Sequence, residues 1–141
     1  VDDHVWSIIV RGYGSSDQAQ DVFATLCNYA GIHACFRCLT DEETKQKRCF
    51  SMIQLKDGWT FVDASRGLIY LNARGTFAGI DDLQSGDFQA VSLQGAVMPD
   101  NAALFLKNVT DQDLQNWKSS RSAIQSPMRR LFFWKRSKTN P

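Results

Sequence analysis

The chain has 141 residues, of which 43% are hydrophobic and 22% are charged, as in a single globular domain with a substantial core. Its net charge of +1 gives no electrostatic argument for nucleic acid, and we expect none to bind. No apolar run approaches the roughly 18 residues of a membrane-spanning helix, and no signal peptide is visible. We expect a cytoplasmic protein, while the start at Val1 rather than Met leaves room for an upstream segment.

The first predicted elements are an ambiguous segment and a helix. Residues 3–10 fit a short helix or a strand, because an apolar run alone does not decide between them. A helix is predicted over residues 16–30, after a glycine turn and before Gly31. Apolar residues follow one helical face in this segment: Val22, Phe23, Leu26, Cys27 and Ala30. Ser15 and Gln18 form a capping-box pattern, which would place Ser16 in the first turn.

The rest of the chain predicts short strands and one more helix. Strands are expected at residues 32–39, 50–55, 59–63 and 67–71. Asp57-Gly58 supplies the turn of a hairpin between the second and third strands. We interpret the charged segment 41–48 as a solvated turn, and assign no element to the Gly- and Asp-rich stretch 75–100. A helix is expected from about residue 109 to 120, with Thr110 as its cap.

The four cysteines allow a metal, a redox or a structural interpretation. Cys35 and Cys38 have CxxC spacing, and Cys49 is near enough in sequence to be a third ligand. However, residues i and i+3 of a strand point to opposite faces, and no second CxxC or histidine pair completes a zinc site. We therefore predict buried free thiols, no metal and no cofactor. Free thiols are typical of a reducing compartment.

The last fifteen residues differ in character from the rest. Residues 127–141 carry four apolar residues between two basic pairs, so we divide the chain into a domain, 1–126, and a tail, 127–141. The basic side chains could contact an anionic membrane or partner: Arg129, Arg130, Lys135 and Arg136. The alternative is that the apolar residues of the tail dock on the core.

Two segments carry a motif in common with a known family. In residues 11–32, a glycine turn leads into a helix that ends in Gly-Ile; in residues 49–65, DGWTFVDA forms a hairpin with the pattern aromatic-x-x-x-Asp. These segments resemble the bacterial transglutaminase-like proteins, which have a papain-like fold and a Cys-His-Asp triad. The resemblance implies an α+β fold with a nucleophile-type helix packed on a small antiparallel sheet. It places the nucleophile at Ser16, the histidine at Phe50 and the aspartate at Asp63.

Two of the three triad positions carry the wrong chemistry. A thiol at position 16 would be activated by the helix dipole, whereas a serine hydroxyl is more basic and needs an adjacent base. Phe50 cannot accept a proton, and neither His4 nor His33 is placed beside the hairpin by the sequence. On the hairpin we expect Met52 near Asp63, with Phe50 as its diagonal neighbour. Asp63 then needs another partner, such as a backbone N–H, Arg66 or water.

We therefore expect a catalytically degenerate transglutaminase-like domain that binds a peptide, glycan or protein, or acts as a scaffold. The cleft between helix and hairpin would hold the ligand through residues beside the relict triad: Tyr13, Ser15, Met52 and Trp59. The alternative is an active acyl transferase or peptidase-type hydrolase that uses Ser16 or a relocated cysteine. Of the thiols, only Cys49 lies near the family's histidine position.

Overall fold

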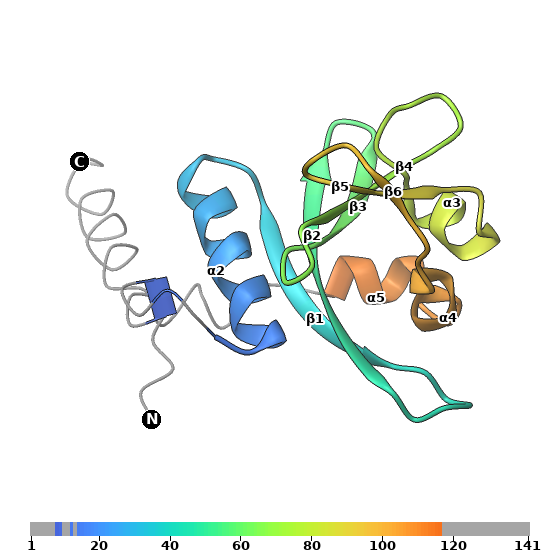
Figure 1. Cartoon of the computed structure of the whole chain (residues 1–141), viewed down its shortest axis with the longest axis horizontal. Coiled ribbons are helices and arrows are strands. Elements are labelled where there is room, and N and C mark those ends of the chain that lie inside the picture. The colour runs from blue at the N-terminus through green and yellow to red at the C-terminus, as the bar shows by residue number, and fades with distance from the viewer. Residues whose placement is uncertain (1–7, 10–11, 13, 117–141) are drawn as a thin grey trace.

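The protein is an α+β structure built on one six-stranded antiparallel sheet, as the sequence predicts at the level of fold class. The computed structural model describes residues 8–9, 12 and 14–116. The strands follow one another in the order β1-β2-β3-β4-β5-β6, without a crossover (Figure 1). Their bounds are β1 Ala34–Thr40, β2 Lys47–Leu55, β3 Gly58–Asp63, β4 Leu68–Leu71, β5 Gln89–Ser92 and β6 Val97–Met98.

Helix α2, Ser16–Tyr29, confirms the predicted helix and its start. Ser15 precedes it in an extended conformation, and its backbone N–H donates to the side chain of Gln18 at 3.0 Å, which satisfies a donor at the helix start. Gly31 follows the helix with a φ of 84°, a conformation that favours glycine. The buried face of α2 is rotated about the helix axis from the predicted one. Leu26 is 51% exposed, and the buried residues include Gln20, Asp21, Ala24, Thr25 and Cys27.

Strands β2 and β3 form the predicted hairpin, whose turn brings Leu55 opposite Gly58. Gly58 has a φ of 123°, which explains the glycine at this turn. The register differs from our expectation in one respect. Met52 pairs with Phe61, rather than lying beside Asp63. The pairing of Ser51 with Val62, extended by one residue on each strand, would bring Phe50 opposite Asp63.

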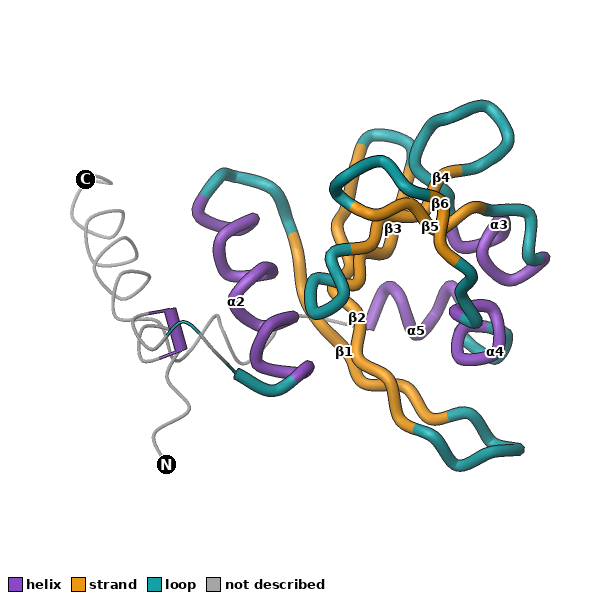
Figure 2. Tube along the Cα trace, in the orientation of Figure 1, coloured by secondary structure: helices purple, strands orange, loops and turns teal. Residues whose placement is uncertain are grey.

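The sheet separates two hydrophobic cores, because neighbouring residues of a strand point to opposite faces. Figure 2 shows α2 on one side of the sheet and the shorter helices on the other. Helix α2 covers one face and buries a small cluster there: Ala24, Cys27, Ala34, Ile53 and Val62. The larger cluster on the other face contains Phe50, Met52, Phe61 and Tyr70. Three short helices complete it: α3 Ile80–Ser85, α4 Ala102–Leu106 and α5 Asp111–Asn116.

Helices α3 and α4 are absent from the sequence-based expectation, and α5 is present in it. Leu83 and Leu106 of the two unpredicted helices are fully buried, so tertiary packing stabilises segments of only five or six residues. Thr110 caps α5 as predicted, since its hydroxyl accepts from the Asp113 N–H at 3.1 Å. The predicted end of this helix near residue 120 is outside the described residues. No helix within the described part of the chain is long and apolar enough to cross a membrane.

Candidate functional site

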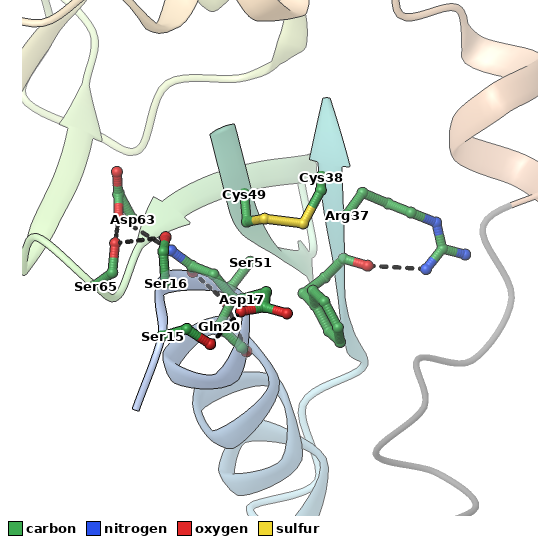
Figure 3. Close-up of a disulfide and its surroundings, with 11 residues drawn as sticks. Ser15, Ser16, Asp17, Gln20, Arg37, Cys38, Cys49, Ser51, Asp63 and Ser65 are labelled. Atoms are coloured by element: carbon green, nitrogen blue, oxygen red, sulfur yellow. Dashed lines mark hydrogen bonds between the residues drawn. A yellow bond between two sulfur atoms is a disulfide. The ribbon is translucent and has the colours of Figure 1, made fainter. Parts of the chain in front are cut away.

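A chain of hydrogen bonds joins the start of α2 to the end of β3. The Ser16 hydroxyl donates to Ser65 Oγ at 3.1 Å, and the Ser65 hydroxyl donates to Asp63 Oδ1 at 2.7 Å (Figure 3). The structure therefore links Ser16 to Asp63 through Ser65, a residue to which the sequence analysis assigned no role. The neighbouring Ser15 is not part of this chain, since its hydroxyl donates to Asp17.

Asp63 is fully buried between the two layers and has partners from both. On the α2 side, Gln20 donates its Nε2 to Asp63 Oδ1 at 3.0 Å. Gln20 is itself fixed by the Ser51 hydroxyl, which donates to Gln20 Oε1 at 2.7 Å. From β2, Arg48 donates to Asp63 Oδ2 from Nε at 3.1 Å and from Nη2 at 2.8 Å. The Arg66 N–H also donates to Asp63, the backbone partner that the sequence analysis proposed.

Arg48 is the centre of this network, although the charged run 41–48 predicted a solvated turn there. It is 7% exposed, and both of its terminal nitrogens donate to Asp100, at 2.9 and 2.7 Å. Nη1 also donates to Asn101 and Nη2 to Tyr70, each at 2.9 Å. The guanidinium lies 4.8 Å from the centre of the Phe50 ring. Arg48, not residue 50, is therefore the β2 residue that contacts the carboxylate of Asp63.

The network shifts the proton affinities of its members in the directions that its charges require. Burial alone would raise the pKa of Asp63, but the hydrogen bonds from Ser65 and Arg48 and the Arg48 charge outweigh it and lower that pKa. Burial opposes the charge on Arg48, yet its bonds to Asp100 and Asp63 raise its pKa. Burial raises the pKa of Tyr70. Asp63 is thus held as a carboxylate and is a weak base.

The lowered pKa of Asp63 predicts a loss of stability in acid. An unfolded aspartate has a pKa of about 3.9, so the folded protein gains stability from Asp63 above that pH. We expect the free energy of unfolding to fall as the pH drops below about 4 and through the lower folded value. Urea unfolding between pH 7 and pH 2.5 measures this fall, which should be smaller in Asp63→Asn. Gln89→Ala, at an exposed site outside the network, removes no ionisable group and should keep the wild-type pH dependence.

The predicted ligand contacts lie in different places. Met52 and Phe50 are fully buried, and Phe50 packs edge-on against Phe61 and Phe105, with ring centres 6.3 Å apart in each pair. Trp59 is half-buried, its ring 5.4 Å from that of His33. It is four residues from Asp63 on the same strand, which is about 13 Å. Tyr13, His4 and the tail with Arg129, Arg130, Lys135 and Arg136 lie outside the described residues.

Trp59 lines a groove of about 820 Å³ between the β2–β3 turn and the loop that follows β4. Phe77, 46% exposed, lies in the same groove, together with the charged residues Asp57, Arg74 and Asp82. Asn72 fixes the loop, since its side-chain oxygen accepts from the backbone N–H groups of Arg74 and Thr76. The groove is therefore formed by ordered turns, at the end of β3 away from Ser16.

Two of the four cysteines form a disulfide, against the prediction of free thiols, and the other two are free as predicted. Cys38 and Cys49 face each other on β1 and β2 and form a disulfide, so the prediction of free thiols is wrong for this pair. The argument from i and i+3 concerned only one strand, whereas the bond joins two. Cys27 and Cys35 are free and buried as predicted. Within residues 8–9, 12 and 14–116, no group of three His, Cys, Asp or Glu side chains could hold a metal ion.

No family model, curated protein or solved structure matches this chain.

Proposed function

We propose that this chain is a catalytically degenerate transglutaminase-like domain that binds a ligand or acts as a scaffold. The motifs of residues 11–32 and 49–65 support the family assignment, and so does a helix that starts beside the end of the hairpin. The observation that carries the loss of catalysis is the Arg48–Asp63 ion pair. It occupies the carboxylate that would orient a catalytic histidine in the family's triad.

Among the described residues, Ser16 has no hydrogen bond to a base of the kind that a hydroxyl nucleophile needs. Its hydrogen bond leads through Ser65 to Asp63, whose lowered pKa makes it a poor proton acceptor. His33, the histidine within the described residues, precedes β1, at the other end of α2 from Ser16, and its ring packs against Trp59. The loss of general-base assistance alone lowers a rate by a factor on the order of 10²–10⁴.

The groove beside Trp59 is the surface we propose for the ligand. Ligand sites combine apolar and aromatic walls with a few polar groups in a volume of several hundred Å³, as this groove does. A peptide or a glycan suits it, because Trp59 and Phe77 offer aromatic surface beside a carboxylate and a guanidinium. Heteronuclear NMR titration with peptide and glycan mixtures would locate binding. Shifts around Trp59 and Phe77 support the proposal, and shifts confined to Ser15 and Ser16 contradict this location.

Covalent labelling tests the loss of catalysis directly. We expect a fluorophosphonate to label the folded protein no faster than the unfolded chain, because the described partners of Ser16 lead only to Asp63, a weak base. Intact-mass spectrometry measures the adduct in the wild type and in Ser16→Ala. Ser15→Ala is the matched control, since it removes a hydroxyl one residue away that is bonded to Asp17. Fast labelling that is lost only in Ser16→Ala would establish an active serine and overturn the proposal.

The alternative, an active hydrolase or acyl transferase, rests on one observation. The Ser16–Ser65–Asp63 chain is continuous, and serine hydroxyls joined to a carboxylate can pass a proton. The labelling experiment above decides between the two.

We also infer an oxidising compartment from the Cys38–Cys49 disulfide, because structural disulfides are rare in the cytosol. This inference opposes the cytoplasmic expectation. Alkylation of the protein in intact cells, followed by mass spectrometry of the Cys38 and Cys49 peptides, would distinguish the compartments.

A further inference from the structure

Strand β6 is an edge strand of the sheet, and one of its residues has backbone groups that β5 does not use. The Ser92 N–H donates to Ala96 O at 2.8 Å, so these two residues form a bonded pair between β5 and β6. Bonded and non-bonded pairs alternate along antiparallel strands, so the next pair, Val91 with Val97, is a non-bonded one. The N–H and C=O of Val97 therefore point away from β5, toward the open edge.

The other edge strand, β1, has its outward carbonyl occupied. The Gln54 N–H donates to His33 O at 2.9 Å, so by the same alternation Phe36 points its backbone groups away from β2. Arg37 donates from Nη1 to Phe36 O at 2.8 Å and caps this carbonyl. In the part of the chain that the structure describes, no side chain makes such a bond to the backbone of Val97. Strand β6 is thus the edge at which a further strand can pair.

The β6 edge is also apolar on both of its faces. Val97 is 61% exposed on the α2 face, and Met98, next along the strand, is 45% exposed on the other. Leu93, in the turn before β6, is 79% exposed. The run from residue 93 to residue 99 contains no charged side chain.

An apolar row on the α2 face leads from the core to this edge. Its members lie opposite one another on successive strands: Val62, Ile69, Val91 and Val97. The exposed fraction rises along the row from 5% at Val62 to 61% at Val97. Helix α2 packs on β1 and β2, and within the described ranges it leaves the outer end of the row uncovered (Figure 1).

Charge and area point to a second copy of the chain as the occupant of this edge. Identical surfaces that meet about a twofold axis bring like charges together, so a self-complementary patch has to be free of charge, as residues 93–99 are. The outward donor and acceptor of Val97 are both satisfied by the same two groups of a second Val97. From the exposed fractions, two such runs would bury on the order of 1,000 Å² in total, which is the lower end of specific interfaces and suits a weak dimer.

We propose that β6 pairs antiparallel with β6 of a second copy, about a twofold axis perpendicular to the sheet at Val97. Each Val97 N–H donates to the C=O of the other Val97, and the two apolar rows join into one across the axis. The pairing uses both β6 edges, so the assembly closes at two copies. It involves neither Ser16 nor the groove beside Trp59, so its failure and that of the proposed function are separate results.

The test combines the mass in solution with amide hydrogen exchange, both on the full chain. In sedimentation equilibrium from about 10 μM to about 1 mM, we expect the average mass to rise from one copy toward two, as for a weak interface. Over the same range, NMR should show the Val97 amide exchanging at least about threefold more slowly as the dimer fills. The Phe36 amide, which faces outward on the other edge strand, is the internal control and should keep its rate.

A charge at the proposed axis should separate the two copies. Val97→Lys places two ammonium groups side by side, and we expect the dissociation constant to rise at least about tenfold. Leu26→Lys is the matched control, because it makes the same kind of change at a 51% exposed residue of α2, and it should dimerise like the wild type. If Val97→Lys does not fold, the exchange of the Val97 amide in the wild type still decides.

Four results would overturn the proposal. They are a mass of one copy at every concentration, masses beyond two copies, a dimer that Val97→Lys leaves intact, and a Val97 amide whose protection is the same at all concentrations. The last result would mean that another segment of the same chain covers β6.

Discussion

Replacing Arg48 by methionine is expected to lower the free energy of unfolding by about 3–5 kcal/mol, the cost of breaking a buried ion pair from one side. The variant leaves Asp63 and Asp100 buried without their cation, and Tyr70 loses its charged donor. Both carboxylates have almost no solvent contact, with side chains 2% and 1% exposed, so water cannot replace the guanidinium. Urea unfolding at pH 7 measures the loss as a lower midpoint with an unchanged slope.

Arg66→Met is the matched control for this experiment. Its guanidinium is 3.8–3.9 Å from the same two carboxylates but is 57% exposed, so we expect a change below about 1 kcal/mol. A triple variant with Arg48→Met, Asp63→Asn and Asp100→Asn should recover part of the loss, because it removes the uncompensated charges. If Arg48→Met fails to fold, the triple variant still provides the test. Equal effects of Arg48→Met and Arg66→Met would contradict the central role of Arg48.

Replacing Phe50 by alanine is expected to cost about 3–5 kcal/mol of stability, the range for a buried aromatic residue. Phe50 has no solvent exposure, and its ring contacts those of Phe61 and Phe105. It also supports the Arg48 guanidinium, so the cavity would loosen the ion-pair network as well as the core. The loss should be seen in the urea midpoint and in increased exchange of the β2 and β3 amide hydrogens.

Phe77→Ala supplies the comparison for Phe50→Ala. Phe77 is also a phenylalanine of the described structure, but its side chain is 46% exposed at the groove. We therefore expect Phe77→Ala to lower the free energy of unfolding by less than about 1 kcal/mol. The two variants remove the same atoms and differ in burial. A cost at Phe50 as small as that at Phe77 would show that position 50 is not a packed core position.

The helix and the hairpin could be predicted because their signals are local. Ser15 and Gln18 are three residues apart, and the bond between them forms at the helix start where the pattern places it. Asp57-Gly58 supplies the tight turn between two apolar runs, so the hairpin could be predicted, although the expected register with Met52 beside Asp63 is wrong and Met52 pairs with Phe61. Such short-range signals favour one local structure before the segment packs against the rest of the chain, and packing then stabilises it.

The ion-pair network around Asp63 could not be predicted in the same way, because its contacts join residues that are far apart in the sequence. Arg48 ends a charged run, which favoured a turn, yet it shares the period of two with Phe50 and Met52, and that period would have predicted its burial. Asp100 lies 52 residues further along, and nothing in the sequence pairs it with Arg48. The disulfide similarly required the register of β1 on β2, and α3 and α4 are shorter than the window in which helical periodicity can be measured.

The sequential strand order has a consequence for the time course of folding. Each strand pairs with the one before it, so the sheet can grow from β1 to β6 through short loops, apart from the longer β4–β5 connection that contains α3. Arg48 and Asp63 meet as soon as β2 and β3 pair, whereas Asp100 follows the last strand. In the early hairpin, Arg48 is therefore paired with only one of its two carboxylates, Asp63, until Asp100 docks. Completion of this ion pair is coupled to completion of the meander, which opposes the accumulation of chains that stop part-way.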